Sequence, residues 1–181
     1  MDQLTLTPYK NVKLPKIVKG VGKNTCFYAS LGNILPITET QIHEIMDNQP
    51  LPRGLDIYQG KEILETKLSP YAKNAIIFHP KDVSELKTFI LEKHNQGSKI
   101  IANFQLQPIY PDYPNYPDIW ANYGHFSPII YVDETQVCIG DVWRKVPDYC
   151  WRSYEILFNG VNTIDGDSNK KRGLLVFDLV E

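Results

Sequence analysis

The stretch Asn122-Tyr123-Gly124-His125-Phe126-Ser127-Pro128 leads into an apolar run from Ile129 to Val132, and these residues decide the fold. A second apolar run, Val137 to Ile139, is followed by Gly140 and Asp141. The polar pair Asp133-Glu134 between the runs predicts a turn, so the two runs should form neighbouring antiparallel strands. That pairing would bring the imidazole of His125 next to the carboxylate of Asp141.

An imidazole oriented by a carboxylate is half of a nucleophilic triad. The segment Asn24-Thr25-Cys26-Phe27-Tyr28-Ala29-Ser30 offers the nucleophile, because Thr25 is a suitable N-cap for a helix running to Leu35. A thiol in the first helical turn faces unpaired backbone N–H groups, which favour the thiolate. The sequence therefore predicts a cysteine hydrolase or acyltransferase with Cys26 as nucleophile, His125 as base and Asp141 as the orienting group.

The remaining cysteines and histidines are assigned structural roles. Cys138 sits in an apolar run and is expected in the core, and Cys150 has no helix start or base of its own. The other histidines share no metal-ligand spacing, so no metal site is expected. They are His43, His79 and His94.

Composition places the chain among ordinary globular proteins. Its 181 residues predict a single domain, 1–181, and the net charge of -2 gives no reason to expect nucleic acid or an anionic membrane as partner. The three cysteines are far apart and form no CxxC pair, so neither a disulfide framework nor a zinc ribbon is supported. No apolar run reaches membrane-spanning length and no signal pattern opens the chain, so we expect a cytoplasmic protein, or one exported without a cleaved signal.

Periodicity and capping signals predict helices in the first half of the chain and an antiparallel sheet later, an α+β fold in which the nucleophile helix packs against the sheet. The proline- and tyrosine-rich segment 108–123 is predicted to be a loop. The predicted helices cover 25–35, 38–48, 59–68, 82–95 and 154–161, and the predicted strands 75–78, 100–106, 129–132, 137–139 and 173–179.

A second group of polar residues lies in the segment 162–173, whose composition alone indicates a turn between a helix and the last strand. Asp165 and Arg172 bracket this turn. If they lie close in space they offer an acceptor and a bidentate donor, which suits the α-ammonium and α-carboxylate of one amino acid.

Taken together, these motifs resemble the phytochelatin synthase family, papain-like cysteine enzymes that act on glutathione. The resemblance extends from about residue 20 to the C-terminus. It is carried by Cys26 with the small-residue helix Ala29-Ser30-Leu31, by Gly124-His125-Phe126-Ser127-Pro128-Ile129, by Asp141-Val142-x-Arg144 with Trp151, and by Asn162-Thr163-x-Asp165 with Ser168 and Arg172-Gly173.

The resemblance implies a papain-like fold and a triad of Cys26, His125 and Asp141. It also implies that Asp165 and Arg172 hold the γ-glutamyl end of glutathione, and we expect Tyr123 and Gly124 to line the same substrate site. The thiol would attack the Cys-Gly amide, release glycine and leave a γ-glutamylcysteinyl thioester. Water would then yield γ-glutamylcysteine, or a second glutathione a phytochelatin. No tightly bound cofactor is implied; cadmium or zinc would enter as a glutathione thiolate complex.

Three features depart from the family. The glutamine expected six residues before the nucleophile is Gly20 here, so the oxyanion hole would rest on the Cys26 backbone N–H and, as its substitute donor, Asn24. The loop before Gly124 is long and could form a lid or acceptor surface; its aromatic residues are Tyr110, Tyr113, Tyr116, Trp120 and Tyr123. We expect no cysteine-rich C-terminal domain, so the chain resembles the short prokaryotic-type members, in which hydrolysis tends to dominate.

Two other functions stay open at this point. A papain-like peptidase could cleave another peptide or a protein conjugate, with specificity set by the tyrosine-rich loop. An inactive descendant could bind glutathione or a partner protein through the same cleft; Gly20 favours that reading and the intact triad opposes it. The sequence also leaves open whether the enzyme hydrolyses the thioester or transfers it to an acceptor, whether it depends on metal ions, and whether it forms a homodimer.

Overall fold

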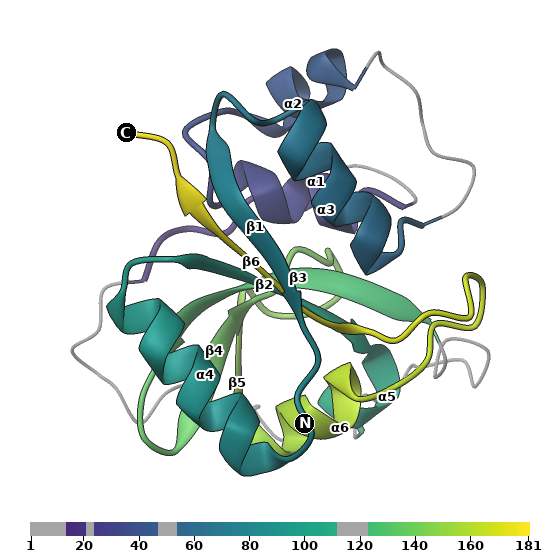
Figure 1. The fold of residues 1–181 in the computed structure, drawn as a ribbon. Coiled ribbons are helices and arrows are strands. Elements are labelled where there is room, and N and C mark those ends of the chain that lie inside the picture. Colours follow the sequence, from purple (N-terminus) through teal and green to yellow (C-terminus); the bar gives the residue numbers. More distant parts are fainter. Residues whose placement is uncertain (1–13, 21–23, 47–53, 112–122) are drawn as a thin grey trace.

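The computed structural model describes residues 14–20, 24–46, 54–111 and 123–181. Within them the chain forms a six-stranded sheet in the order β1-β6-β2-β3-β4-β5, and every neighbouring pair is antiparallel (Figure 1). The strands are β1 (Ala72–Phe78), β2 (Lys99–Gln105), β3 (Gly124–Val132), β4 (Gln136–Gly140), β5 (Tyr149–Ser153) and β6 (Gly173–Leu179).

Helices cover both faces of the sheet (Figure 1). One face carries α1 (Cys26–Gly32), α2 (Glu39–Ile45) and α3 (Ile57–Thr66), and the other carries α4 (Val83–Asn95), α5 (Leu106–Ile109) and α6 (Tyr154–Val161). The predicted α+β fold, with the nucleophile helix against an antiparallel sheet, is confirmed.

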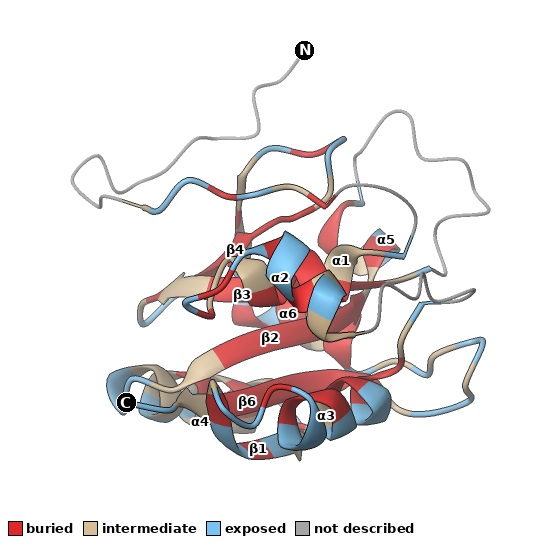
Figure 2. Cartoon of the chain, turned by 90° about the horizontal axis from the view of Figure 1, so that it is seen from above, coloured by how far each residue is buried: buried red, intermediate tan, exposed pale blue. Residues whose placement is uncertain are grey.

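Strand β6 shows how the sheet separates two apolar cores. Its side chains alternate between the faces, as the two-residue period of a strand requires. Leu174 and Val176 join the core under α4 and α6, whereas Leu175 and Phe177 join the core under α1 and α3. Figure 2 shows that the buried residues concentrate in the strands and on the inward sides of the helices.

The structure corrects the sequence prediction around β3. The strand begins at Gly124, five residues earlier than predicted, so His125 lies within it and not at its mouth. Pro128 is tolerated inside the strand because β4 pairs with β3 only from Ile129 onward, which leaves that side of Pro128 without a ladder partner. The short elements α5 and β5 were not predicted at all.

Several helix starts follow the capping signals of the sequence. The predicted capping box of Thr38 and Gln41 is present at α2. Asp56 and Gln59 form a second box, which starts α3 two residues before the predicted position. The Asp56 carboxylate also accepts from Lys170 Nζ at 2.9 Å, which ties α3 to the turn before β6.

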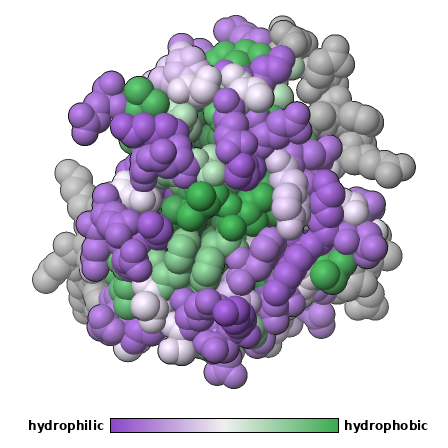
Figure 3. Space-filling model, viewed as in Figure 1, coloured by the Kyte–Doolittle hydropathy of each residue, from purple (hydrophilic) through white to green (hydrophobic). Residues whose placement is uncertain are grey.

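One face of the molecule combines a hydrophilic surface with an apolar area. The face in Figure 3 is mostly hydrophilic, with an apolar area along β1. A shallow open groove there is lined by Phe78 and Phe89, whose rings stack at 3.7 Å, and by charged residues of α4. In the described part of the chain no helix has the length and apolar character needed to cross a membrane.

Candidate active site

Helix α1 places Cys26 at its first position, against strand β3. The Ser30 hydroxyl donates to the Cys26 carbonyl at 2.7 Å and lies 3.0 Å from the Phe126 carbonyl, which links the helix to the strand. Phe27 packs on Phe126 with ring centroids 5.1 Å apart. Thr25 is the N-cap, as predicted, but its side chain makes no capping hydrogen bond. The thiol is therefore positioned by packing of α1 on β3.

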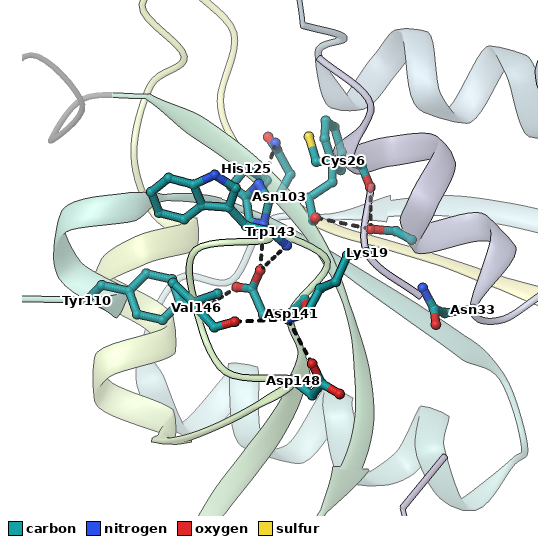
Figure 4. A network of polar contacts seen from close by, with 12 residues as sticks. Lys19, Cys26, Asn33, Asn103, Tyr110, His125, Asp141, Trp143, Val146 and Asp148 are labelled. Atoms are coloured by element: carbon teal, nitrogen blue, oxygen red, sulfur yellow. Dashed lines mark hydrogen bonds and ion pairs between the residues drawn. The ribbon is translucent and has the colours of Figure 1, made fainter. Parts of the chain in front are cut away.

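His125 lies between the thiol and a carboxylate (Figure 4). Its Nε2 is 3.0 Å from Asp141 Oδ1, and the ring is within hydrogen-bonding reach of the Cys26 thiol. Both partners of the ion pair are buried, His125 at 6% and Asp141 at 0% exposure. The rings of Phe104 and Trp143 flank the imidazole at 5.5 and 6.4 Å. The structure thus brings the three predicted triad residues together.

Charges in the site favour a thiolate–imidazolium pair. Burial by itself would raise the pKa of the Cys26 thiol, but the hydrogen bond and charge of His125, with the backbone N–H groups of Phe126 and Phe27, hold that pKa below its usual value. Burial opposes protonation of His125, yet Asp141 and Cys26 raise its pKa to about 10. Because the two groups titrate as a pair, their protonation states change together.

The Asp141 carboxylate stays charged although it is fully buried. Burial raises its pKa, but this is outweighed by His125, by the Tyr110 hydroxyl and by the Trp143 backbone N–H, and the pKa lies below its usual value. Oδ1 accepts from His125 and from Trp143 N at 2.7 Å, and Oδ2 accepts from Tyr110. Three donors replace the water that the carboxylate loses.

Tyr110 is a site residue that the sequence did not identify. It was grouped with the aromatic residues of a lid loop, but it is only 4% exposed and its hydroxyl points at Asp141 (Figure 4). No periodicity or spacing links Tyr110 to Asp141, because they meet only through the tertiary fold. Of the other loop aromatics, Tyr123 is 54% exposed, and Tyr113, Tyr116 and Trp120 lie outside the described residues.

A second unpredicted contact comes from the segment before α1. Lys19 Nζ donates to the carbonyls of Asp141 at 2.7 Å and Val146 at 3.0 Å, and lies 3.1 Å from the Asp148 carboxylate (Figure 4). The Gly20 N–H donates to the Val142 carbonyl at 2.9 Å. The segment therefore holds the loop that follows β4 and carries Asp141.

Gly20, where the resemblance predicts a glutamine, lies against the start of α1. A Cβ atom built on Gly20 would be 2.6 Å from Thr25 Oγ1. The threonine hydroxyl therefore occupies the space into which a longer side chain at position 20 would extend. Asn24 is exposed and has a φ of 61°, in the left-handed region that asparagine tolerates. Its part in an oxyanion hole stays a prediction, and residues 21–23 lie outside the described chain.

Asp165 and Arg172 lie together beside the residue that precedes His125. Arg172 Nη2 donates to Asp165 Oδ2 at 2.9 Å, and Nη1 donates to the Ile164 carbonyl at 2.6 Å. A Cβ atom on Gly124 would be 2.9 Å from Arg172 Nη2 and 3.1 Å from Asp165 Oδ2. A side chain at position 124 would therefore require the Arg172–Asp165 pair to shift from its observed position.

The accessibility of the two charges differs. The Arg172 side chain is 2% exposed and that of Asp165 is 17% exposed. Asp165 Oδ1 also accepts from the Ser168 N–H at 3.0 Å within the turn. Asp165 is therefore the charge that solvent or a ligand can reach, with Arg172 packed behind it.

The other cysteines are buried. Burial raises the pKa of both thiols, Cys138 and Cys150, to about 12. Across the residues that the structure describes, no group of three or more His, Cys, Asp or Glu side chains is arranged to hold a metal ion.

Comparison with known proteins gives a likeness in structure. No protein-family model and no curated protein sequence matches the chain. A crystal structure from Bacillus anthracis, described as that of a candidate C39-like peptidase, superposes with a TM-score of 0.56 over 91% of this chain and 94% of that one. The chain has a papain-like fold. The sequences are only 11% identical, so the likeness is one of fold.

Proposed function

We propose that the protein is a cysteine-dependent enzyme that cleaves an amide through a thioester on Cys26. The observation that carries the proposal is the line of thiol, imidazole and carboxylate formed by Cys26, His125 and Asp141. Residues from α1, β3 and the loop after β4 converge in this line although they are distant in sequence. Such an arrangement supports nucleophilic acyl transfer.

The geometry assigns a role to each group. The Cys26 thiolate attacks the amide carbonyl, and its backbone N–H, at the start of α1, would donate to the developing oxyanion. The imidazolium of His125 gives its proton to the leaving amine, while Asp141 stabilises the charged ring from Nε2. Neutral His125 then takes a proton from water, or from an acceptor thiol or amine, which attacks the thioester and frees the enzyme.

For the substrate we propose glutathione, cleaved at its Cys-Gly amide as in the phytochelatin synthase family. Support comes from the Asp165–Arg172 pair, which lies against Gly124, one residue from the base. The free ammonium and carboxylate of a γ-glutamyl group are complementary to a carboxylate–guanidinium pair. Because Asp165 is the more accessible charge, the substrate ammonium would bind there, and its carboxylate would lie toward Arg172.

The peptidase alternative also has support. The similar solved structure is described as a candidate C39-like peptidase, and Asp165 already accepts hydrogen bonds within its own turn. If that turn has only a structural role, the active site would accept an ordinary peptide. An α-linked and a γ-linked substrate would then be cleaved at the same rate.

The two functions are separated by offering glutathione and the α-linked peptide Glu-Cys-Gly to the purified protein and identifying products by mass spectrometry. We expect release of glycine from glutathione and little cleavage of the α-linked peptide, whose charged groups are displaced from the pair. Parallel reactions with cadmium or zinc would show whether a glutathione thiolate complex is the better substrate. Equal cleavage of both peptides would favour the peptidase function. The Cys26→Ala variant is the negative control in both reactions.

A further inference from the structure

The Tyr110 hydroxyl makes a contact that the proposed reaction does not explain. It donates to Asp141 Oδ2, the carboxylate oxygen that faces away from His125. Asp141 is 0% exposed, so water cannot replace this donor. Oδ1 has two donors, His125 Nε2 and the Trp143 N–H, whereas Tyr110 is the donor found for Oδ2 among the described residues.

The hydroxyl is held in place from several sides. Tyr110 is the C-cap of α5, and its N–H donates to the Leu106 carbonyl at 3.0 Å. The guanidinium of Arg152 lies 5.5 Å from the centre of the ring, and its Nε donates to the Ile109 carbonyl at 2.6 Å. The Cys150 thiol, in β5, is within hydrogen-bonding reach of the same hydroxyl. Among the described residues, the charged and titratable groups around the ring are Asp141, Cys150 and Arg152.

We propose that Tyr110 is a positioning residue of the active site, which fixes the Asp141 carboxylate so that Oδ1 faces the imidazole. With Tyr110 in place, the carboxylate has one orientation that satisfies both oxygens. Without the hydroxyl, Oδ2 is a buried acceptor with no donor among the described residues, and only the two hydrogen bonds to Oδ1 still hold the carboxylate in place. This inference rests on the proposed role of Cys26, because Tyr110 acts on the thiol only through Asp141 and His125.

The expected consequence concerns the thiol. A carboxylate that is held by fewer donors aligns less well with the ring, so it stabilises the imidazolium less. A less stable imidazolium stabilises the Cys26 thiolate less. The pH at which the thiolate forms should then move upward in Tyr110→Phe, by roughly half a unit to one unit.

The test measures the rate of Cys26 alkylation by iodoacetamide against pH, with the modified cysteine identified by peptide mapping. Tyr154→Phe is the matched control: Tyr154 is also 4% exposed in the same core, and its hydroxyl donates to the Asp133 carbonyl at 2.7 Å, away from the triad. We expect a shifted profile in Tyr110→Phe and the wild-type profile in Tyr154→Phe. Unchanged profiles in both variants, or equal shifts in both, would overturn the proposal.

A double-mutant cycle tests whether Tyr110 acts through Asp141. In an Asp141→Asn background, Tyr110→Phe should cause no further shift. An additive shift would mean that Tyr110 acts on the site by another route, and would contradict the inference even if the single variant behaved as expected.

Alkylation needs no substrate, so this test is independent of whether glutathione is cleaved. A wild-type Cys26 that alkylates only at the pH of an ordinary thiol would contradict the proposed function, and the role of Tyr110 with it. If the wild-type thiol reacts well below pH 8 and the Tyr110→Phe profile is not shifted, only the proposed role of Tyr110 is contradicted.

Discussion

Cys26 owes its expected reactivity more to His125 than to its helix. Helix α1 is short and its N-cap side chain makes no capping bond, so the helix end offers only backbone N–H groups to the sulfur. Among the groups that lower the pKa of the thiol, the hydrogen bond from His125 is the largest and its charge the next. The nucleophile should therefore be sensitive to every residue that holds the imidazole.

Replacing the sulfur tests the assignment directly. Cys26→Ala should abolish glycine release and leave the unfolding temperature close to that of the wild-type protein, because the side chain is partly exposed and small. Cys138→Ala is the control, since that thiol is buried and its pKa is raised to about 12. Retained activity in Cys26→Ala would assign the chemistry to another residue.

Asp141→Asn should lower kcat by roughly a few orders of magnitude, because an amide can select the wrong imidazole tautomer and cannot stabilise the imidazolium. His125→Ala removes the base and should come close to the loss in Cys26→Ala. Steady-state rates of glycine release measure both. Full activity in Asp141→Asn would show that another residue orients His125.

The pH dependence of the reaction follows from the same pair. The rate should rise as the pH passes the lowered pKa of Cys26, and fall again near pH 10 as His125 loses its proton. Single-turnover rates from mildly acidic to strongly alkaline pH would show this broad maximum. A rate that climbs only around the pKa of an ordinary thiol would contradict the ion pair.

At the scale of elements, the turn before β6 joins the candidate substrate site to α3. Lys170 of this turn bonds to the Asp56 carboxylate, which also caps α3 through the Tyr58 and Gln59 N–H groups. The turn that carries Asp165 is thereby tied to the helix layer.

Removing that carboxylate should affect both stability and substrate binding. Asp56→Ala removes a helix cap and an ion pair, and should lower the free energy of unfolding by about 2 kcal/mol. Asp82→Ala removes only the cap of α4 and should lower it by about 1 kcal/mol. Urea denaturation measures both. Only Asp56→Ala should also raise KM for glutathione. An equal KM in the two variants would show that the position of the turn does not depend on the Lys170–Asp56 ion pair.

The Asp165–Arg172 pair can be tested by replacing its more accessible member. Asp165→Asn should lower kcat/KM for glutathione by roughly tenfold to a hundredfold, because it removes a charge-assisted contact to the substrate ammonium. Asp167→Asn, two residues further along the same turn and exposed, is the control. Cys26 should alkylate normally in both. Unchanged turnover in Asp165→Asn would remove the argument for a γ-glutamyl substrate.

The elements differ in how well the sequence predicted them. The bounds of α6 and β6 agree with the prediction, because a serine cap, apolar spacing and a glycine mark them. Strand β5 has no alternating pattern, and the short α5 contains a proline, so neither carries a local signal. In the site, the triad positions could be found from motifs. Tyr110 and Lys19 could not, since each reaches Asp141 or its loop only across the fold.

At the scale of the molecule, the triad depends on a contact between chain segments that lie far apart. Lys19 donates to two carbonyls in the loop after β4, and Asp148 neutralises its charge. Lys19→Met would leave those carbonyls without their donor. We expect a loss of about 1.5 to 3 kcal/mol in unfolding free energy and a lower kcat. Lys16→Met, in the exposed part of the same segment, should change neither quantity; equal effects would mean that the charge alone matters.

Acid stability should also reflect the site. The pKa of Asp141 is lower in the folded protein than in the unfolded chain, so the carboxylate contributes stability at pH values above its usual pKa, and this contribution is lost as the pH falls through the lowered value. In Asp141→Asn the acid limb of the stability curve should be flatter. Thermal unfolding at several acidic pH values measures this difference, and superimposable limbs would contradict it.

The position of β6 has a consequence for how the protein is made. Although β6 comes after the other strands in the chain, it lies between β1 and β2. During translation the ribosome therefore releases β1 to β5 before the strand that must separate the first two of them. Until residues 173–179 emerge, the apolar faces that β6 joins stay incomplete on both sides of the sheet. We expect the nascent chain to bind chaperones until residues 173–179 have emerged from the ribosome, and the thiol to become reactive only afterwards.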